Sequence, residues 1–510
     1  MIDVTRRKFL KRSVASVIIA PWLMSCESYG EVGRVQSAAP FDEFLNVDTL
    51  DLANLIKTKQ LSQMELLEIV IRRIEAANPT LNFMTNRFYD RAHGRIANMS
   101  LDTPFAGVPM LLKDMVDLAG MPRTDGSNFP PINIPAHSGM YVAGLERAGM
   151  NFIGMTNVPE YAGVGGTDND RFGATRNPWN LAYYPAFSSG GSAAAVAAGV
   201  LPMAHGTDGA GSNRLTASVT GLLGMKATRY RMLADTHSGQ HDIAKTNQMI
   251  SRSVRDSAQA FHLTQDPKNG LYPTEKLIVS PNSKRLKIGF VRDSSGLVET
   301  SAEILMATEN SARLLENLGH TVVETSYPVS AEMYFKHYLN FFAGKTAGLK
   351  DVIEAFAGKP LLESGLLTTF LAGSLIANES VTSEEVLSAR AYFDTLPALF
   401  DKKFERFDLL LTPVAPLAGV RIDESGADKE FNQASARSLI GFLKFTGPVN
   451  FAGCPAMSAP FTWQSEAGLP IGMHLIAARG NDRMLYELGY ELEEAQPWKN
   501  RWAPHSLMYT

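Results

Sequence analysis

The chain has 510 residues, of which 45% are hydrophobic and 20% are charged, and it carries a formal net charge of −4. A chain of this length can bury one large core, although its length alone would also allow about two to four domains. The slightly negative charge gives no electrostatic reason to expect a nucleic acid as a partner.

The first 26 residues resemble an export signal. Residues 5–11 (TRRKFLK) are similar to a twin-arginine signal, and the apolar stretch that follows is too short to span a bilayer as a helix. Residues 23–26 (LMSC) resemble a lipobox, which predicts a lipid on Cys26; the alternative is an ordinary cysteine in a signal peptide cut elsewhere. We expect a bacterial protein that is periplasmic or anchored to a membrane by this lipid, with residues 27–45 as a tether and 46–510 as the folded domain.

Short apolar runs alternate with helical patterns along the rest of the chain: 108–112, 151–155, 286–291, 409–411 and 472–476. Such runs are typical of buried strands, and their alternation with helices favours an α/β fold with helices on both faces of the sheet. Ser62 and Glu65 form a capping box that predicts a helix start, and Asn78-Pro79 predicts the end of that helix.

Two glycine-rich turns that carry serines flank residues 193–200, whose small side chains predict a tightly packed helix joining the turns. In the second turn, Gly209, Ala210 and Gly211 precede Ser212, and residues this small let consecutive backbone N–H groups converge on one point. Such a nest can hold an oxyanion. A serine beside it is placed to attack a carbonyl group.

A serine nucleophile needs a base, and no histidine follows at a revealing spacing. The apolar run in residues 107–114 (GVPMLLKD) ends in Lys113, and burial would lower the pKa of this lysine toward neutrality. Ser188, in the first turn, would then relay the proton. We therefore expect Lys113 to be the base.

These three residues resemble the Ser-Ser-Lys triad of the amidase signature family in order and approximate spacing: Lys113 in GVPMLLKD, Ser188 in FSSGGSAAAVAAG and Ser212 in GTDGAGSNR. The resemblance covers nearly the whole chain after about residue 45. It implies one α/β/α domain with a mixed central sheet, a variable helical region at 330–400 that borders the substrate, Ser212 as the nucleophile, Ser188 as the relay, Lys113 as the general base, and an oxyanion hole from the N–H groups of residues 209–211.

The chain departs from the family pattern near both serines. Ala186 and Phe187 stand where the family usually has glycines. Ala210 and Asn213 depart from the family motif around the nucleophile. None of these changes removes a member of the triad. Residues 205–212 (HGTDGAGS) resemble the corresponding motif of the branch that includes cyclic amide and 6-aminohexanoate-oligomer hydrolases.

Other polar residues of this region receive supporting roles. Asp208 and Arg214 flank the nucleophile turn, and we expect them, with Ser189, to brace the turn rather than to react. Cys454 is expected to be buried and inert. The sequence holds no HExxH pattern, no paired cysteine or histidine clamp and no GxxxxGK[ST] loop, so we expect neither a metal nor another cofactor.

The sequence thus predicts an exported amidase that hydrolyses a small-molecule amide, such as a peptide amide, an aryl amide or an aminohexanoate-type amide, through an acyl-enzyme on Ser212. Three alternatives remain open. Ser188 could serve a Ser-His-Asp hydrolase with a histidine such as His474, because AFSSG resembles a nucleophile elbow. The chain could be a catalytically degenerate binding lipoprotein. It could also be a glutamine-amidotransferase subunit of the same family, against which the export signal argues.

Overall fold

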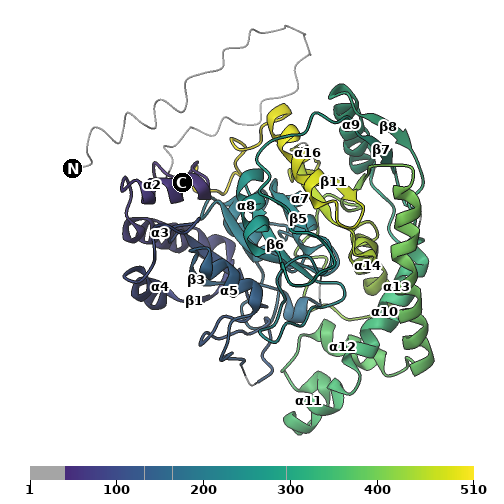
Figure 1. The fold of residues 1–510 in the computed structure, drawn as a ribbon. Coiled ribbons are helices and arrows are strands. Elements are labelled where there is room, and N and C mark those ends of the chain that lie inside the picture. The colour runs from purple at the N-terminus through teal and green to yellow at the C-terminus, as the bar shows by residue number, and fades with distance from the viewer. Residues whose placement is uncertain (1–40, 131, 164, 295, 464, 510) are drawn as a thin grey trace.

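The computed structural model describes residues 41–130, 132–163, 165–294, 296–463 and 465–509 (Figure 1). The predicted export signal, Cys26 and most of the predicted tether lie outside these residues. Among the described helices, none is long and apolar enough to cross a membrane.

The described strands form two hydrogen-bonded sheets. The smaller has the order β1 (Met84–Arg87), β3 (Asn151–Thr156) and β2 (Pro109–Lys113). The larger has the order β4 (Met203–Asp208), β6 (Thr246–Ser251), β5 (Leu223–Lys226), β10 (Ala456–Thr462), β11 (Ile471–Ala477), β9 (Leu409–Pro413), β7 (Lys287–Phe290) and β8 (Thr321–Glu324). Parallel pairs occur in both sheets, at β2–β3 and at β7–β8 and β7–β9, beside antiparallel ones.

Helices precede and follow these strands along the whole described chain. They are α2 (Thr49–Lys57), α3 (Gln63–Leu81), α4 (Tyr89–Ile96), α5 (Met140–Arg147), η1 (Glu160–Ala162), α6 (Gly190–Ala197), α7 (Ser212–Thr220), α8 (Val254–Thr264), α9 (Ala302–Asn317), α10 (Ala331–Thr346), α11 (Leu349–Ala357), η2 (Leu361–Glu363), α12 (Thr369–Asn378), α13 (Ser383–Phe404), α14 (Gln433–Phe442), α15 (Gly447–Ala452) and α16 (Asp482–Ala495).

Successive residues of a strand point to opposite faces of the sheet, and here they enter different parts of the core. Met203 of β4 packs in the same cluster as residues of α8 and α16, whereas its neighbour Ala204 packs with residues of α3 and α6. Met249 and Ile250 of β6 divide in the same way. Helices therefore cover both faces of the larger sheet, and the predicted α/β fold with a mixed sheet is confirmed. The strands form two sheets rather than one, and these adjoin at β2 and β4.

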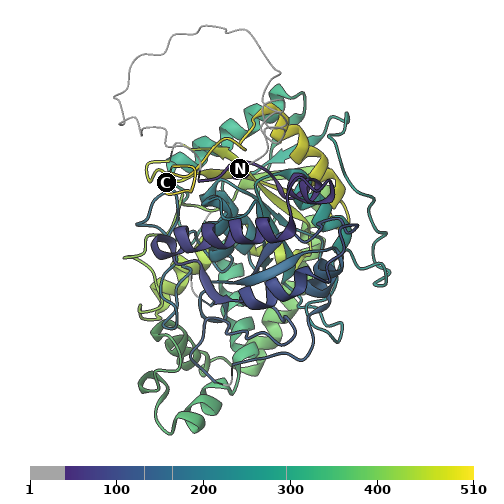
Figure 2. The same cartoon turned by 90° about the vertical axis from the view of Figure 1, so that its left-hand side faces the viewer.

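The N-terminal helices α2 to α4 lie on one side of the molecule, toward the viewer in Figure 2. The capping box at the start of α3 is confirmed, since Ser62 and Glu65 each bond to the other's backbone N–H. The predicted end of α3 was wrong, because the helix continues through Pro79 to Leu81. Pro79 cannot donate to the carbonyl of Glu75, but only two helical residues follow it, so the lost hydrogen bond falls in the last turn of α3.

The five predicted strands are all present, but the segment between the two serine turns was only partly predicted. The small residues do form a helix, α6, and all of it is buried. Instead of leading directly to the second turn, α6 is followed by β4, a strand that the sequence did not predict. The sequence of β4, MAHGTD, has little intrinsic preference for a strand, and its pairing with β6 over six residues determines its conformation.

The helical region α10 to α13 lies at the opposite side of the molecule from α2 to α4 (Figure 1). Its aromatic residues pack face to edge and face to face around Phe393 and Phe451, whose rings stack at 3.8 Å between centroids. Helix α10 contacts α12, α13 and α14. Side chains from α10, α12 and α14 line one common cavity.

Candidate active site

Lys113 is the last residue of β2, and its whole side chain is buried. Strand β2 pairs with β3 on one side and lies beside β4 on the other, where the Lys113 backbone N–H donates to Nδ1 of His205 at 3.3 Å. An apolar strand thus delivers a single amine to the point where the two sheets adjoin.

The amine of Lys113 is surrounded by neutral oxygen atoms. Nζ lies 2.8 Å from Oγ of Ser188 and 2.8 Å from Oγ1 of Thr207. It lies 3.1 Å from Oγ of Ser189 and 3.3 Å from the carbonyl oxygen of Thr207. No carboxylate among the described residues forms an ion pair with it, so the environment offers hydrogen bonds without a counter-charge.

This environment holds the pKa of Lys113 well below its usual range. Burial is the main cause, and the cation of Lys245 lowers the pKa further, while the carboxylates of Asp208 and Asp125 oppose the shift. Lowering the pKa increases the fraction of the amine that is neutral and carries a lone pair. The neutral amine can then accept a proton, which an ordinary ammonium group cannot do.

The two serine turns meet next to the amine of Lys113. Oγ of Ser188 lies 2.8 Å from Oγ of Ser212, and the backbone N–H of Ser189 donates to Oγ of Ser212 at 2.7 Å. The hydroxyl of Ser189 lies 3.1 Å from the same oxygen and also donates to the carbonyl of Thr207 at 3.0 Å. The structure therefore brings Lys113, Ser188, Ser189 and Ser212 into one hydrogen-bonded cluster.

Ser212 is the first residue of α7, and the turn before it has an unusual backbone. Gly211 has a φ of 130°, and a Cβ at this position would collide with the side chain of Thr446. Only glycine fits there. Gly209 and Ala210 line the cavity in front of Ser212, and no described residue accepts a hydrogen bond from either backbone N–H.

The third amide predicted for the oxyanion hole is used differently. The N–H of Gly211 donates to Oδ1 of Asp208 at 2.8 Å. Among the described residues, the amides of the turn without an acceptor are those of Gly209, Ala210 and Ser212. The last of these is the first N–H of helix α7, where the helix dipole also favours a negative charge.

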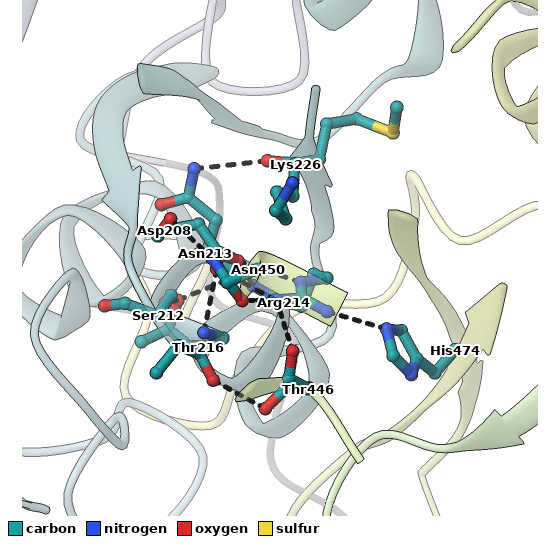
Figure 3. Close-up of polar contacts among 12 residues, drawn as sticks. Asp208, Ser212, Asn213, Arg214, Thr216, Lys226, Thr446, Asn450 and His474 are labelled. Atoms are coloured by element: carbon teal, nitrogen blue, oxygen red, sulfur yellow. Dashed lines mark hydrogen bonds and ion pairs between the residues drawn. The ribbon is translucent and has the colours of Figure 1, made fainter. Parts of the chain in front are cut away.

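Asp208 and Arg214 form a fully buried ion pair beneath the turn (Figure 3). Two guanidinium nitrogens of Arg214 donate to the two carboxylate oxygens of Asp208, both at 2.9 Å. Arg214 also donates to the carbonyl of Thr446 at 3.1 Å and to Asn450 at 2.6 Å. The pKa of Asp208 falls to about 2: burial alone would raise it, but the cation and the hydrogen bonds outweigh burial. That these residues brace the turn stays a prediction, which the contacts support.

His474, proposed as the partner of Ser188 in a Ser-His-Asp hydrolase, lies elsewhere. Its Nε2 accepts from Arg214 at 3.0 Å, because a guanidinium only donates, and its Nδ1 lies 2.8 Å from Oγ1 of Thr412 (Figure 3). Burial and the Arg214 cation hold the pKa of His474 well below its usual range. In the described structure neither ring nitrogen contacts Ser188 or Ser212. The geometry does not provide this alternative.

A cavity of about 300 Å³ opens in front of Ser212. Most of its wall is apolar and comes from Phe187 and from helices α10, α12 and α14 and their flanks: Tyr338, Leu339, Phe342, Phe370, Leu371, Phe431, Ala436, Leu439, Ile440 and Leu443. Three charged side chains, Asp242, Lys245 and Lys345, lie on the side of the 235–245 loop and the end of α10. Asp242 and Lys345 form an ion pair at 2.8 Å.

Several residues of this site were not found from the sequence. Thr207 directly precedes Asp208, within the quoted GTDGAGS motif, but nothing in the motif showed that its hydroxyl would reach Lys113. Thr446 and Asn450 lie in residues 446–453 (TGPVNFAG), to which the sequence alone assigned no role. No motif in the sequence indicated that Lys245 belongs to the site. Cys454 is buried, as expected, and burial raises the pKa of its thiol to about 12. Among the described residues, no group of three or more metal-ligating side chains occurs.

Comparison with known proteins identifies the class of enzyme. A family model described as Amidase matches residues 65–486, which is most of the chain. The protein belongs to the amidase family, as the motifs predicted, and is therefore a hydrolase that acts on carbon–nitrogen bonds.

Two relatives from the family are about one-third identical to this chain. A putative amidase, AmiC, of Mycobacterium tuberculosis is 32% identical over 474 residues, which cover 91% of this chain and 98% of the relative. A 6-aminohexanoate-cyclic-dimer hydrolase of Paenarthrobacter ureafaciens is 32% identical over 482 residues, which cover 89% of this chain and 96% of the relative. The predicted similarity to the cyclic-dimer hydrolase branch is thus confirmed.

Solved structures agree with the sequence relatives. A 6-aminohexanoate cyclic dimer hydrolase in complex with its substrate superposes with a TM-score of 0.80 at 29% identity, covering 90% of this chain and 99% of the other. A bacterial aryl acylamidase of the amidase signature family superposes with a TM-score of 0.77 at 27% identity, covering 88% and 96% of the two chains.

Proposed function

We propose that the protein hydrolyses a small-molecule carboxylic amide through an acyl-enzyme on Ser212, with Ser188 as the proton relay and Lys113 as the general base. The observation that carries this proposal is the continuous contact from Nζ of Lys113 to Oγ of Ser188 and on to Oγ of Ser212, with 2.8 Å at each step. The chain of contacts ends at the apolar cavity that can receive a substrate.

The neutral amine of Lys113 has two N–H groups and one lone pair. The N–H groups can donate to Thr207 and Ser189, which leaves the lone pair for the hydroxyl of Ser188. Ser188 can then accept the proton of Ser212 as Ser212 attacks the substrate carbonyl. One proton moves from Ser212 to Ser188 and another from Ser188 to Lys113, so Ser188 ends the step unchanged.

The negative charge that develops on the carbonyl oxygen needs nearby donors. The N–H groups of Gly209, Ala210 and Ser212 supply them in this proposal, in place of the originally expected Gly211. Collapse of the tetrahedral intermediate breaks the C–N bond, and the proton held by Lys113 returns through Ser188 to the leaving amine. Water then attacks the acyl group and gives a proton through Ser188 to Lys113. That proton returns to Oγ of Ser212 as the bond between this oxygen and the acyl group breaks, which releases the acid.

The cavity and the relatives support a choice of substrate class. Aromatic and aliphatic side chains dominate the wall, which favours an amide with an aryl or alkyl group. One relative is named for a cyclic aminohexanoate dimer and one structural neighbour is an aryl acylamidase. We propose aryl amides and aminohexanoate-type amides as the first substrates to test, with peptide amides beside them.

The test is turnover of an amide panel by the parent protein and by Lys113→Ala, Ser188→Ala and Ser212→Ala. Ser374→Ala is a matched control, because Ser374 lines the same cavity but bonds within its own helix. We expect the triad variants to lose at least about a thousandfold in kcat and the control to stay near the parent. A fluorophosphonate probe should label Ser212. Full activity of Ser212→Ala would contradict the proposal, and an inert parent that the probe does not label would favour a degenerate binding module.

We also propose that residues 1–26 direct export and that Cys26 receives a lipid, on the similarity of residues 5–11 and 23–26 to the two signals. Replacing both Arg6 and Arg7 with lysine should retain the protein in the cytoplasm. The variant Cys26→Ser should release the exported protein from membranes. Unchanged membrane association of Cys26→Ser would show that no lipid on this residue is needed.

A further inference from the structure

A second, smaller cavity of about 100 Å³ lies next to the catalytic one. Its lining includes Gly165, Phe442 and the polar residues Glu424, Lys429 and Ser435. Three side chains line both cavities: Phe187, Phe370 and Leu439. They come from the first serine turn, from α12 and from α14, and we call them the partition.

The three members of the partition are held to different degrees. The ring of Phe187 packs against Phe442 at 5.3 Å between centroids, and the ring of Phe370 packs against Phe431 at 5.3 Å. Both phenylalanines are buried, whereas Leu439 is only partly buried. The two rings are therefore anchored by aromatic neighbours, and Leu439 is the member with the most freedom to be replaced.

Leu439 also has a small neighbour on the far side. A Cβ placed on Gly165 would lie 3.0 Å from Cδ1 of Leu439, so the absence of a side chain at Gly165 leaves the leucine its room. Truncating Leu439 removes atoms between the catalytic cavity and the space beside Gly165. The gap would join the two cavities, since Leu439 lines both of them.

We propose that this partition limits the length of the alkyl part of the substrate, and that the space behind it is a subsite for the end of a longer chain. This inference rests on the proposed amide hydrolysis at Ser212. The smaller cavity has room for roughly three or four methylene groups, if each takes about the volume of a water molecule. Its polar residues suit a chain end that carries a hydrogen-bonding group.

The test uses two homologous series of amides. One series has primary amides of linear carboxylic acids of increasing length, and the other has acetamides of linear alkylamines. In the parent, kcat/KM should rise about three- to fourfold with each methylene that enters the apolar wall and then stop rising at a limiting length. The series that shows the limit tells whether the acid or the amine half of the substrate faces the partition.

The central variant is Leu439→Ala, and its matched control is Leu443→Ala. Leu443 lines the catalytic cavity but not the smaller one, so the control removes the same atoms without opening the partition. We expect Leu439→Ala to move the limiting length by three or four methylene groups and Leu443→Ala by no more than one or two. Phe370→Ala tests the same partition from another helix if Leu439→Ala folds poorly, and labelling of Ser212 by a small serine probe reports whether each variant is folded.

The outcomes separate the two proposals. Turnover and Ser212 labelling in every variant, with the same limiting length for Leu439→Ala and Leu443→Ala, would overturn the partition and leave the proposed function intact. A parent that hydrolyses neither series and is not labelled at Ser212 would overturn the proposed function and the partition with it.

Discussion

The carboxylate of Asp208 accepts the backbone N–H of Gly211 at 2.8 Å, one residue before Ser212. The same carboxylate is held by Arg214, which in turn bonds to Thr446 and Asn450 from a distant part of the chain. We therefore expect the shape of the turn that presents Ser212 to depend on a buried ion pair. Asp208 contacts neither Lys113 nor Ser188 in the described structure, although its charge opposes the lowering of the Lys113 pKa.

Replacing Asp208 with asparagine should destabilise the protein strongly. The side-chain amide of Asp208→Asn could still accept from Gly211, but the guanidinium of Arg214 would be left as a buried charge without its counter-ion, which costs about 3–5 kcal/mol. Chemical denaturation measures the change. Asp423→Asn is the control, because Asp423 pairs with Arg421 at an exposed site and its loss should leave the midpoint unchanged. Equal midpoints for the two variants would contradict the bracing role of Asp208.

Neighbouring positions of the nucleophile turn should respond very differently to the same methyl group. Gly211→Ala adds a Cβ that would collide with Thr446 at a φ that only glycine adopts easily, so we expect a fall in kcat of at least about a hundredfold. Ala210→Gly removes a Cβ from the cavity side and should stay within a few fold of the parent. Steady-state kinetics on the best amide measures both, and a tolerated Gly211→Ala would contradict this description of the turn.

The cation of Lys245 should influence the pH dependence of catalysis. Burial first and Lys245 second lower the pKa of Lys113, so Lys245→Met should raise that pKa again. Because only neutral Lys113 can act as the base, activity is lost below its pKa, and the acidic limb of the kcat/KM profile should move to higher pH. Lys245→Arg keeps the charge and should keep the parent profile. Identical acidic limbs for the methionine and arginine variants would contradict this electrostatic role.

Lys113 should also reduce the stability of the fold. The unfolded lysine is protonated below a pKa of about 10.5, whereas the buried amine has a much lower pKa, so folding must release a proton. The unfolded state binds more protons in this window, and the stability of the parent should rise with pH from the lowered pKa up to the ordinary lysine range. Lys113→Met should be inactive, at least as stable as the parent at neutral pH, and should show a smaller rise, because buried Lys226, whose pKa burial lowers to about 7, still contributes one. Denaturation at several pH values tests it; a variant that is less stable at all of them would refute it.

His474 should matter for stability and little for the chemistry. Its ring accepts a hydrogen bond from Arg214, so His474→Gln should lower the melting temperature, while kcat per labelled active site stays within about tenfold of the parent. Ser188→Ala should lose far more activity. Loss of turnover in His474→Gln to the level of Ser188→Ala, in protein that remains folded, would restore the Ser-His-Asp alternative.

Strands buried on both faces were the easiest part of the fold to predict. Residues 108–112 and 409–411 are apolar throughout, because both of their faces meet helices, and an observed strand coincides with each run. The capping box of α3 was equally readable, since its two partners are three residues apart. Strand β4 could not be predicted in this way. Its sequence has little strand preference, and its conformation comes from pairing with β6, about 40 residues later.

The chemistry of the site also has one part that short motifs predict and another that depends on tertiary contacts. Residue types, their order and the small residues around Ser188 and Ser212 were enough to predict the family, because these are local properties of short motifs. The contacts that make a base of Lys113 were not readable, since they join residues 75 and 94 positions apart and depend on how β2 meets β4. The same holds for three other features: the bond from Gly211 to Asp208, the effect of Lys245 on Lys113, and the partition. Each arises only when the sheets and helices pack. A sequence specifies which groups are available, and packing sets their distances and their burial, on which pKa values and cavity walls depend.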